Sequence, residues 1–181
     1  MEKKWDIPAD GVKLHIGCGK RIFKGYINID KYEDVAQLKA DAAKTGFPPK
    51  SVKEILCIHT IEHIEPSHFM EALVHWKEIL RPDGVVILRC PNAVIYLKEW
   101  LRAYVERNVS YLDGWGRINM LGHSKHAGTL NRQLFTPELL KMKLESAGFS
   151  RVDVHVGETR PEAKNTFEFR EDGDIHCEAR I

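Results

Sequence analysis

The sequence lacks the long apolar stretches that mark an exported or membrane-inserted chain. Among its 181 residues the most apolar stretch, 84–97, is interrupted by Arg89 and Pro91, whereas a membrane span needs about 20 predominantly apolar residues. The first residues, Met1–Asp6, contain no apolar core of the kind found in signal peptides. We therefore predict a cytoplasmic protein with no membrane partner.

An excess of charge of either sign is also missing, and so are paired cysteines. The chain has 27 Lys and Arg residues against 26 Asp and Glu residues, a formal net charge of +1, so its overall charge does not favour a nucleic-acid partner. Its four cysteines, at positions 18, 57, 90 and 177, form no CxxC pair. This spacing favours reduced, buried thiols over a disulfide framework, and we predict no metal site.

Short apolar runs separated by loops predict a series of β-strands. Five runs lie in the first half of the chain, at 12–16, 26–30, 35–41, 54–59 and 84–90, and two lie near its end, at 152–156 and 175–181. The runs at 54–59 and 84–90 are almost continuously apolar, which is typical of parallel strands covered on both faces. The turn signal Asp172-Gly173 predicts an antiparallel strand at the end of the chain.

Three segments between these strands have the periodicity of helices. The first follows Pro66 and ends at Arg81–Gly84, and its apolar stripe is Phe69, Met70, Leu73, Trp76 and Leu80. The second follows the run at 84–90, and its stripe is Val94, Leu97, Leu101, Tyr104 and Val105. The third opens at Thr136-Pro137-Glu138 and closes at Gly148. We expect these apolar stripes to face the core.

Strands that alternate with helices predict an α/β fold with a mostly parallel sheet and right-handed crossovers. The length corresponds to one domain, so we assign residues 1–181 to a single domain with an N-terminal arm at 1–11. The segment 108–135 shows no apolar period and is predicted to be a lid or a substrate loop. In open sheets of this kind, ligands lie beyond the carboxyl ends of the strands.

Glycines stand at the predicted carboxyl end of the first strand. Gly17 and Gly19 flank Cys18 directly after the run at 12–16, and such a bend lets the backbone approach a ligand closely. Ile22 occupies the place of the third glycine in a dinucleotide fingerprint, and no Gly-Lys-Ser/Thr follows. The pattern therefore disfavours a ligand bound through its phosphates.

Acidic residues stand at the ends of the next two predicted strands. Asp30 ends the second run and can accept hydrogen bonds from both hydroxyls of a ribose. Asp41 ends the third run and is placed to receive an exocyclic amine such as that of adenine. Each aspartate alone could instead cap a turn or a helix. Together, at successive strand ends, they favour a nucleoside pocket.

Seven short motifs follow one another along the chain. They are LHIGCGK (14–20), INID (27–30), KADAAKTGFP (39–48), EILCIHTIEHI (54–64), LRPDG (80–84), LRCPN (88–92) and SAGF (146–149). In this order they resemble the motifs of class I S-adenosylmethionine-dependent methyltransferases, in the small-molecule branch with an LEH-like sequence after the fourth strand. The resemblance covers residues 12–157.

This resemblance implies a Rossmann-like, seven-stranded sheet with the last strand antiparallel and S-adenosylmethionine as the cofactor at its carboxyl edge. Only about nine residues separate the first two strands, fewer than a parallel crossover usually has, so the first crossover helix is expected to be reduced. The implied cofactor contacts are Gly17, Cys18 and Gly19 with the methionine portion, Asp30 with the ribose, Asp41 and Ala42 with the adenine, and His59 and Thr60 with the sulfonium region.

The implied reaction is methyl transfer to a small-molecule or sugar-like acceptor. Transfer from a sulfonium is an in-line displacement, which requires the nucleophile and the methyl group to be close and collinear in a dry pocket. Where the acceptor must lose a proton, a neutral histidine is the natural base. The candidates are His59 at the end of the fourth strand, and His123 and His126 in the segment 108–135.

Two alternative functions stay open. The sequence His59-Thr60-Ile61-Glu62-His63 matches the HxxEH motif of a zinc hydrolase, which requires both histidines on one helical face. The strand-like run before His59 and Pro66 after the motif argue against such a helix. The shortened first crossover is also compatible with a non-catalytic nucleoside-binding or interaction module on the same fold.

Overall fold

A computed structural model describes residues 5–122, 130–157 and 173–181 of the chain. In chain order the elements are β1 (Val12–Ile16), β2 (Ile27–Asp30), β3 (Leu38–Lys39), β4 (Val52–Ile58), the 3₁₀-helix η1 (Ile61–His63), α1 (Pro66–Ile79), β5 (Leu80–Pro91), α2 (Ala93–Val105), α3 (Val109–Tyr111), the π-helix η2 (Leu112–Gly116), α4 (Arg117–Leu121), α5 (Pro137–Ser146), β6 (Arg151–Val156) and β7 (Asp174–Arg180). Each predicted strand is present, although β3 has only two residues.

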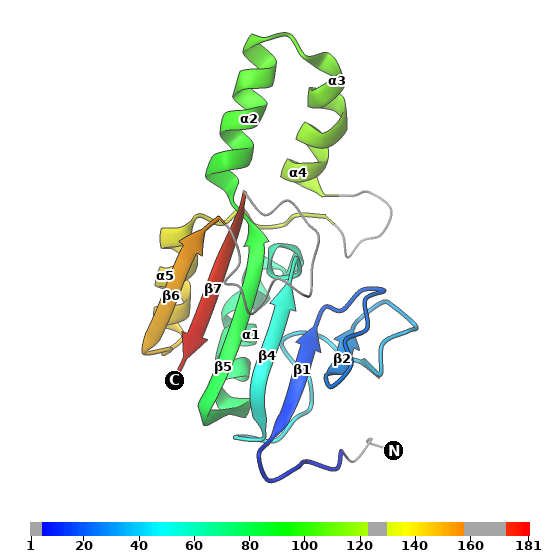
Figure 1. Cartoon of the computed structure of the whole chain (residues 1–181), viewed down its shortest axis with the longest axis vertical. Helices are drawn as coiled ribbons and strands as arrows, with labels where there is room; N and C mark the ends of the chain where they lie inside the picture. Colours follow the sequence, from blue (N-terminus) through cyan, green and yellow to red (C-terminus); the bar gives the residue numbers. More distant parts are fainter. Residues whose placement is uncertain (1–4, 123–129, 158–172) are drawn as a thin grey trace.

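The strands form one seven-stranded sheet in the order β3-β2-β1-β4-β5-β7-β6. The pairs from β3 to β5 are parallel, whereas β7 runs antiparallel to both β5 and β6. The Rossmann-like α/β fold with an antiparallel last strand is therefore confirmed. β1, β4 and β5 point toward the same edge (Figure 1), which gathers their carboxyl ends.

The hydrophobic core lies between the sheet and two helices on one of its faces, α1 and α5 (Figure 1). Alternate residues of each strand point to this face, because successive side chains of a strand project to opposite sides. They pack against Phe69 and Trp76 of α1 and against Leu140 and Leu144 of α5, whose side chains are all fully buried. The stripe predicted for the first helix thus faces the core.

The opposite face of the sheet carries both polar and apolar side chains and has no helix in the described part of the chain. A row of paired residues crosses it from β4 to β6, namely Ile58, Arg89, His176 and His155. The described helices cover only one face of β4 and β5, yet Leu56, Arg89 and His176 on the other face are also buried. An apolar run identifies a buried strand, but it does not identify what covers each side.

The reason lies in the first connections of the chain. Right-handed crossovers place the connections β1 to β2 and β2 to β3 on the face opposite to α1 and α5. These connections are residues 17–26 and 31–37, all of them described, and they contain turns but no helix. The reduced first crossover is therefore confirmed, and this face lacks the helices that such crossovers usually supply.

A helical hairpin stands beyond the carboxyl edge, built by α2, α3, η2 and α4 (Figure 1). Asn92 caps α2, because its side chain accepts a hydrogen bond from the N–H of Val94 at 3.1 Å. The described part of 108–135 is therefore helical between 109 and 121, and not irregular as the missing apolar period suggests. The lid or substrate-loop role of this segment stays a prediction.

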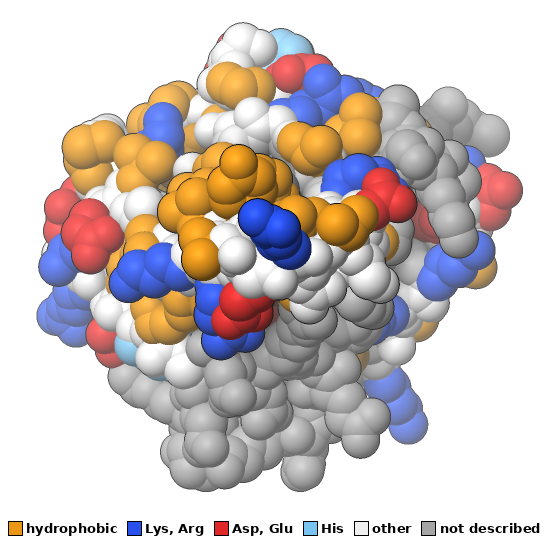
Figure 2. Space-filling model, turned by 90° about the horizontal axis from the view of Figure 1, so that it is seen from above, with side chains coloured by type: hydrophobic (Ala, Val, Ile, Leu, Met, Phe, Trp, Pro, Cys, Tyr) orange, Lys and Arg blue, Asp and Glu red, His pale blue; other side chains and the backbone are white. Residues whose placement is uncertain are grey.

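The apolar stripe of α2 does not face the core, which corrects a prediction. Its members are 38% to 78% exposed, the list being Val94, Leu97, Leu101, Tyr104 and Val105. Hydrophobic side chains with Lys and Arg among them are visible on the end of the molecule seen in Figure 2. Helical periodicity shows that one side is apolar, but only the fold decides whether another element covers it.

Two further expectations concern the membrane and the cysteines. None of the helices in the described part of the chain has the length and apolar character that crossing a membrane requires. Cys18, Cys57, Cys90 and Cys177 are all buried free thiols, as predicted. Burial raises the pKa of Cys18, in the glycine turn, to about 11, so this residue is a thiol at neutral pH.

Candidate functional site

The turn after β1 brings its backbone against the end of β2. Gly17 and Gly19 have φ angles of +69° and +54°, a left-handed conformation that glycine adopts without steric cost. The N–H of Gly19 donates to Oδ2 of Asp30 at 2.9 Å. The structure therefore brings together the glycines and the first aspartate that the sequence assigns to one pocket, while their contacts with a cofactor stay a prediction.

The carboxylate of Asp30 holds two loops at once. Its Oδ1 accepts hydrogen bonds from the N–H groups of Tyr32 at 2.8 Å and Glu33 at 3.1 Å, and its Oδ2 binds Gly19. An ionised carboxylate has about four acceptor positions, so capacity for one further donor remains. The Tyr32 side chain beside it is 58% exposed, and sequence analysis did not identify this residue.

Asp41 lies near the same edge, after β3. Its Oδ2 pairs with Nζ of Lys31 at 2.9 Å, and its Oδ1 accepts the N–H of Ala43 at 3.0 Å. Burial alone raises the pKa of Asp41, but the Ala43 N–H and the Lys31 ammonium outweigh burial and lower this pKa below its usual value. The carbonyl of the adjacent Ala42 accepts Nε1 of Trp76 at 2.8 Å, which anchors this turn to α1.

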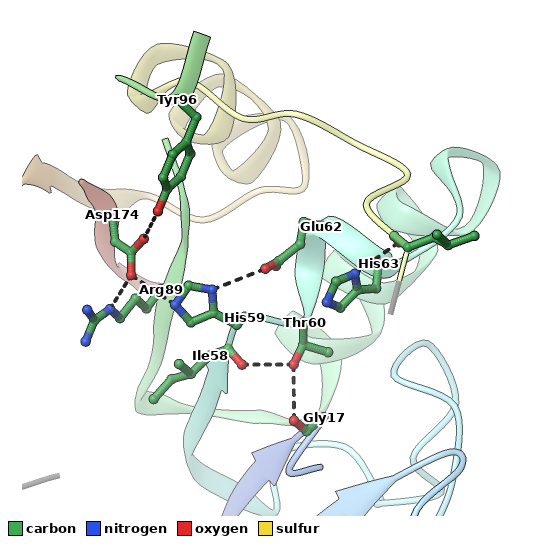
Figure 3. A network of polar contacts seen from close by, with 10 residues as sticks. Gly17, Ile58, His59, Thr60, Glu62, His63, Arg89, Tyr96 and Asp174 are labelled. Carbon is green, nitrogen blue, oxygen red and sulfur yellow. Dashed lines mark hydrogen bonds and ion pairs between the residues drawn. The ribbon is translucent and has the colours of Figure 1, made fainter. Parts of the chain in front are cut away.

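Thr60 connects the end of β4 to the glycine turn. Its hydroxyl Oγ1 points at the carbonyl oxygens of Gly17, at 3.2 Å, and of Ile58, at 3.1 Å (Figure 3). A Cβ atom on Gly17 would lie 2.6 Å from the Cβ of Thr60, closer than two such atoms approach. The two loops therefore fit together only because residue 17 has no side chain.

His59 lies at the centre of a polar network that spans three strands (Figure 3). Its Nε2 meets Oδ2 of Asp174, on β7, at 2.9 Å, and its Nδ1 lies 3.4 Å from Oε1 of Glu62. The same Asp174 accepts Nε of Arg89, on β5, at 2.7 Å and the hydroxyl of Tyr96 at 3.3 Å. Both ring nitrogens of His59 thus face carboxylates.

This environment keeps His59 protonated. Burial alone lowers its pKa, but Asp174 and Glu62 outweigh burial and raise the pKa to about 9. With a cationic His59, the charges of Arg89 and His59 balance those of Asp174 and Glu62. These carboxylates thus stabilise the protonated form of His59, and its role as a base stays a prediction.

The HxxEH residues do not form the helix that a zinc hydrolase requires. His59 has a left-handed φ of +49°, and the 3₁₀-helix η1 begins only at Ile61. Nδ1 of His63 faces the carbonyl of Leu130 at 3.0 Å, while His59 faces Asp174 and Glu62. The two histidines therefore point to different partners (Figure 3), and the zinc-hydrolase alternative is not supported by this geometry.

The residues of the site differ in part from those that the sequence predicts. His123 and His126, the two further candidate bases, lie outside the described residues. Asp174, Arg89 and Tyr96 were not identified as site residues. Asp174 directly follows the Asp172-Gly173 turn signal, which was interpreted only as a turn, and no local pattern connects it to a histidine 115 positions earlier.

Comparisons with known proteins agree with this arrangement. Residues 14–88, from β1 into β5, match the family model described as a methyltransferase domain. Over these residues the chain is similar to methyltransferase domains. A comparison with curated proteins found no match.

The fold of the chain is also found in solved structures. A S-adenosylmethionine-dependent methyltransferase from Archaeoglobus fulgidus has 17% identity and a TM-score of 0.62, over 97% of this chain and 88% of that one. One from Thermotoga maritima has 15% identity and a TM-score of 0.61, over 93% and 81%. A 1,6-didemethyltoxoflavin-N1-methyltransferase from Burkholderia thailandensis has 17% identity and a TM-score of 0.55, over 93% and 70%. At these identities the likeness shows the fold.

The structures from Archaeoglobus fulgidus and Thermotoga maritima are described as S-adenosylmethionine-dependent methyltransferases, and the Burkholderia enzyme was solved with S-adenosylhomocysteine bound. The residues at the carboxyl edge of the present chain fit such a cofactor. A Cβ atom on Gly19 would meet nothing within 4 Å, so the backbone of the turn borders open space. Asp30, with its remaining acceptor capacity, lies directly behind that turn.

The raised pKa of His59 predicts how the stability of the protein depends on pH. Its folded pKa of about 9 exceeds the unfolded value of about 6.5, so its stabilising effect is complete below pH 6.5 and lost as pH rises through 9. We expect the stability advantage of wild type over His59→Gln to fall by about 1 kcal/mol as pH rises from about 6.5 to about 9. The expected change is this small because 33% of the His59 side chain is exposed to solvent. Urea unfolding at both ends of the range measures it.

His63→Gln is the matched control for this experiment, because the imidazole of His63 faces a carbonyl oxygen and not two carboxylates. Its stability difference from wild type should change less with pH than that of His59→Gln. A pH-independent difference for His59→Gln would contradict the protonated state of His59.

Proposed function

We propose that this protein transfers a methyl group from S-adenosylmethionine to a small-molecule or sugar-like acceptor. The observation that carries the proposal is the left-handed turn Gly17–Gly19, which is hydrogen-bonded to the carboxylate of Asp30 at the carboxyl edge of the sheet. This turn and this carboxylate both lie in residues 14–88, the part that matches a methyltransferase domain.

Each proposed cofactor contact follows from a feature of this edge. The backbone of Gly17, Cys18 and Gly19 would pass beneath the methionine portion, because a turn that borders open space allows close approach. Asp30 would accept a ribose hydroxyl through its remaining acceptor position. Asp41 and Ala42 would border the adenine, beside the exposed ring of Tyr32. S-adenosylmethionine, when bound, supplies an electrophilic methyl group on its sulfonium.

The residues at the end of β4 would position the reacting groups. His59 and Thr60 flank the proposed sulfonium region, and each is fixed by hydrogen bonds to a neighbouring strand or loop. A rigid wall of this kind favours a collinear arrangement of nucleophile and methyl group. The carboxylates that face His59 favour its protonated form, so among the candidate bases His59, His123 and His126 we favour the last two for proton removal from an acceptor.

Two observations support a small acceptor. The similar enzyme from Burkholderia thailandensis was solved with 1,6-didemethyltoxoflavin and S-adenosylhomocysteine bound, so this fold accommodates a small acceptor beside the cofactor. In the present chain, the helical hairpin of α2 to α4 stands over the carboxyl edge (Figure 1). A hairpin in this position can enclose a small molecule against the edge.

The proposal predicts binding of S-adenosylmethionine and of S-adenosylhomocysteine with one site per chain. Calorimetric titration of the full chain should give dissociation constants of about 1 μM to 1 mM, the range of typical Michaelis constants. Incubation with methyl-labelled S-adenosylmethionine and a small-molecule filtrate of a cell extract should then give a labelled low-mass product.

Three results would separate the alternatives. If both ligands bind but no fraction of the extract is labelled, the non-catalytic nucleoside-binding module is the better description. If neither ligand binds at millimolar concentration while the chain is folded, the proposed cofactor site is wrong. Label in macromolecules alone would retain the methyltransferase but overturn the small-molecule acceptor.

A further inference from the structure

The apolar stripe of α2 becomes more exposed toward the tip of the helical hairpin. Val94, at the base, is 38% exposed and Leu101, in the middle, is 56% exposed, whereas Val105, at the end of α2, is 78% exposed. Val109, at the start of α3, is 69% exposed. The hairpin stands at one end of the molecule (Figure 1), so its apolar residues are most accessible where the molecule ends. Contiguous apolar patches of this kind mark interaction surfaces.

Basic side chains border this stripe. Lys98 lies three positions before Leu101. Arg102 lies three positions before Val105, and residues at this spacing are neighbours on the surface of a helix. Arg107 follows α2 at the tip of the hairpin, and all three basic side chains are exposed. No carboxylate in the described ranges forms an ion pair with Lys98 or Arg107.

The acidic residues of α2 and its C-cap lie on a different side of the helix. Neither Glu99 nor Glu106 is three or four positions from a member of the stripe, and both line a hollow on another side of α2. Glu99 accepts a hydrogen bond from the hydroxyl of Tyr111 at 2.7 Å, which holds it there. The stripe of α2 therefore has basic residues on its border, while the carboxylates lie away from it.

Two aromatic rings form the other border of the stripe. Trp100 lies three positions after Leu97 and four before Tyr104. The rings of Trp100 and Tyr104 are stacked, with centroids 6.0 Å apart, and Tyr104 is 63% exposed. Trp and Tyr are enriched where proteins meet the interface of a lipid bilayer, because each combines an apolar ring with a polar group.

We propose that the tip of this hairpin binds the surface of a lipid bilayer that contains anionic lipids. The apolar stripe enters the boundary between headgroups and acyl chains, and Lys98, Arg102 and Arg107 lie among the anionic headgroups, as in other interfacial amphipathic helices. Such a helix does not span the bilayer. The expectation of no membrane partner rests on the missing span and signal peptide, so it does not address this kind of contact.

The border of the stripe favours a bilayer over a second copy of the chain. Two copies that joined their stripes would have basic and aromatic side chains on the border but no carboxylate, because Glu99 and Glu106 line the hollow. Like charges that meet at an interface weaken association. The rising exposure toward the tip also fits a flat surface that is approached end-on, rather than a groove that covers the whole helix.

Co-sedimentation of the full chain with vesicles tests the proposal. The chain should bind vesicles of phosphatidylcholine and phosphatidylserine at least about tenfold more tightly than vesicles of pure phosphatidylcholine, and added salt should weaken this binding. Lys98→Gln should weaken binding to the mixed vesicles about fivefold. The double variant Leu101→Gln, Val105→Gln should weaken it at least about tenfold, because two side chains then lose their burial in the bilayer.

Two variants on α5 are the matched controls. Lys141→Gln removes an exposed lysine, and Met142→Gln removes an apolar side chain that is 53% exposed. Both should bind the mixed vesicles like the wild type. Because all the replaced side chains are exposed, every variant should keep the wild-type melting temperature.

Four results would overturn the proposal. They are no binding to the mixed vesicles, equal binding to both kinds of vesicle, equal losses in the hairpin and α5 variants, and a dimer in size-exclusion chromatography that the double variant dissociates. The last result would mean that a second copy covers the stripe. This surface lies apart from the proposed cofactor contacts, so the test is valid whether or not S-adenosylmethionine binds.

Discussion

Replacement of Gly17 by alanine should destabilise the protein by about 3 kcal/mol or more, the sum of a left-handed backbone and an overpacked contact. The φ of Gly17 is +69°, which an alanine adopts at a cost of about 1 to 2 kcal/mol. Its new Cβ atom would also lie 2.6 Å from the Cβ of Thr60. Thr60 is stiff and hydrogen-bonded, so it cannot easily move aside. Urea unfolding measures the loss.

Gly46→Ala isolates the steric part of this effect. Gly46 has a similar φ of +78°, but a Cβ atom there would meet nothing within 4 Å. Its replacement should therefore cost only the backbone term, about 1 to 2 kcal/mol. Thr60→Gly in the Gly17→Ala background should restore part of the stability. Equal losses at Gly17 and Gly46, with no recovery by Thr60→Gly, would show that the two loops are not packed as described.

The parts of the site that the sequence predicts are those encoded locally. A strand end followed by Gly17-Cys18-Gly19 specifies a left-handed turn, because few residues other than glycine adopt that conformation. Asp30 ends β2 and Asp41 follows the end of β3, and parallel pairing brings those ends to one edge. Their proximity follows from strand order and chain direction, both of which the alternating apolar runs indicate.

The parts that the sequence does not predict depend on distant segments. His59 and Asp174 are 115 positions apart, and only the insertion of β7 beside β5 brings them together. The same contact determines the protonation of His59, so a base role could not be judged from the sequence. The exposed stripe of α2 is a similar case, because its periodicity is correct but no described element packs against it.

Replacement of Asp30 by asparagine should weaken the binding of S-adenosylmethionine about 10- to 100-fold, since a charge-assisted hydrogen bond to a ligand contributes about 1.5 to 3 kcal/mol. Asparagine has nearly the shape of aspartate but carries no charge, and its amide N–H₂ would face the N–H of Gly19 where Oδ2 now accepts. Both effects weaken the proposed ribose contact. Calorimetric titration of wild type and variant gives the two dissociation constants.

Asp34→Asn is the matched control, because Asp34 lies close in sequence and, among the residues that the structure describes, pairs only with the exposed Lys39. It should bind the cofactor like the wild type. A second ligand separates direct contact from loop support. It is an S-adenosylhomocysteine analogue that lacks the ribose hydroxyls. If Asp30 binds those hydroxyls, wild type and Asp30→Asn should bind this analogue with equal affinity. If the two proteins differ in affinity for the analogue as much as for S-adenosylmethionine, Asp30 acts only by holding Gly19. If they bind S-adenosylmethionine equally well, Asp30 is not part of the cofactor site.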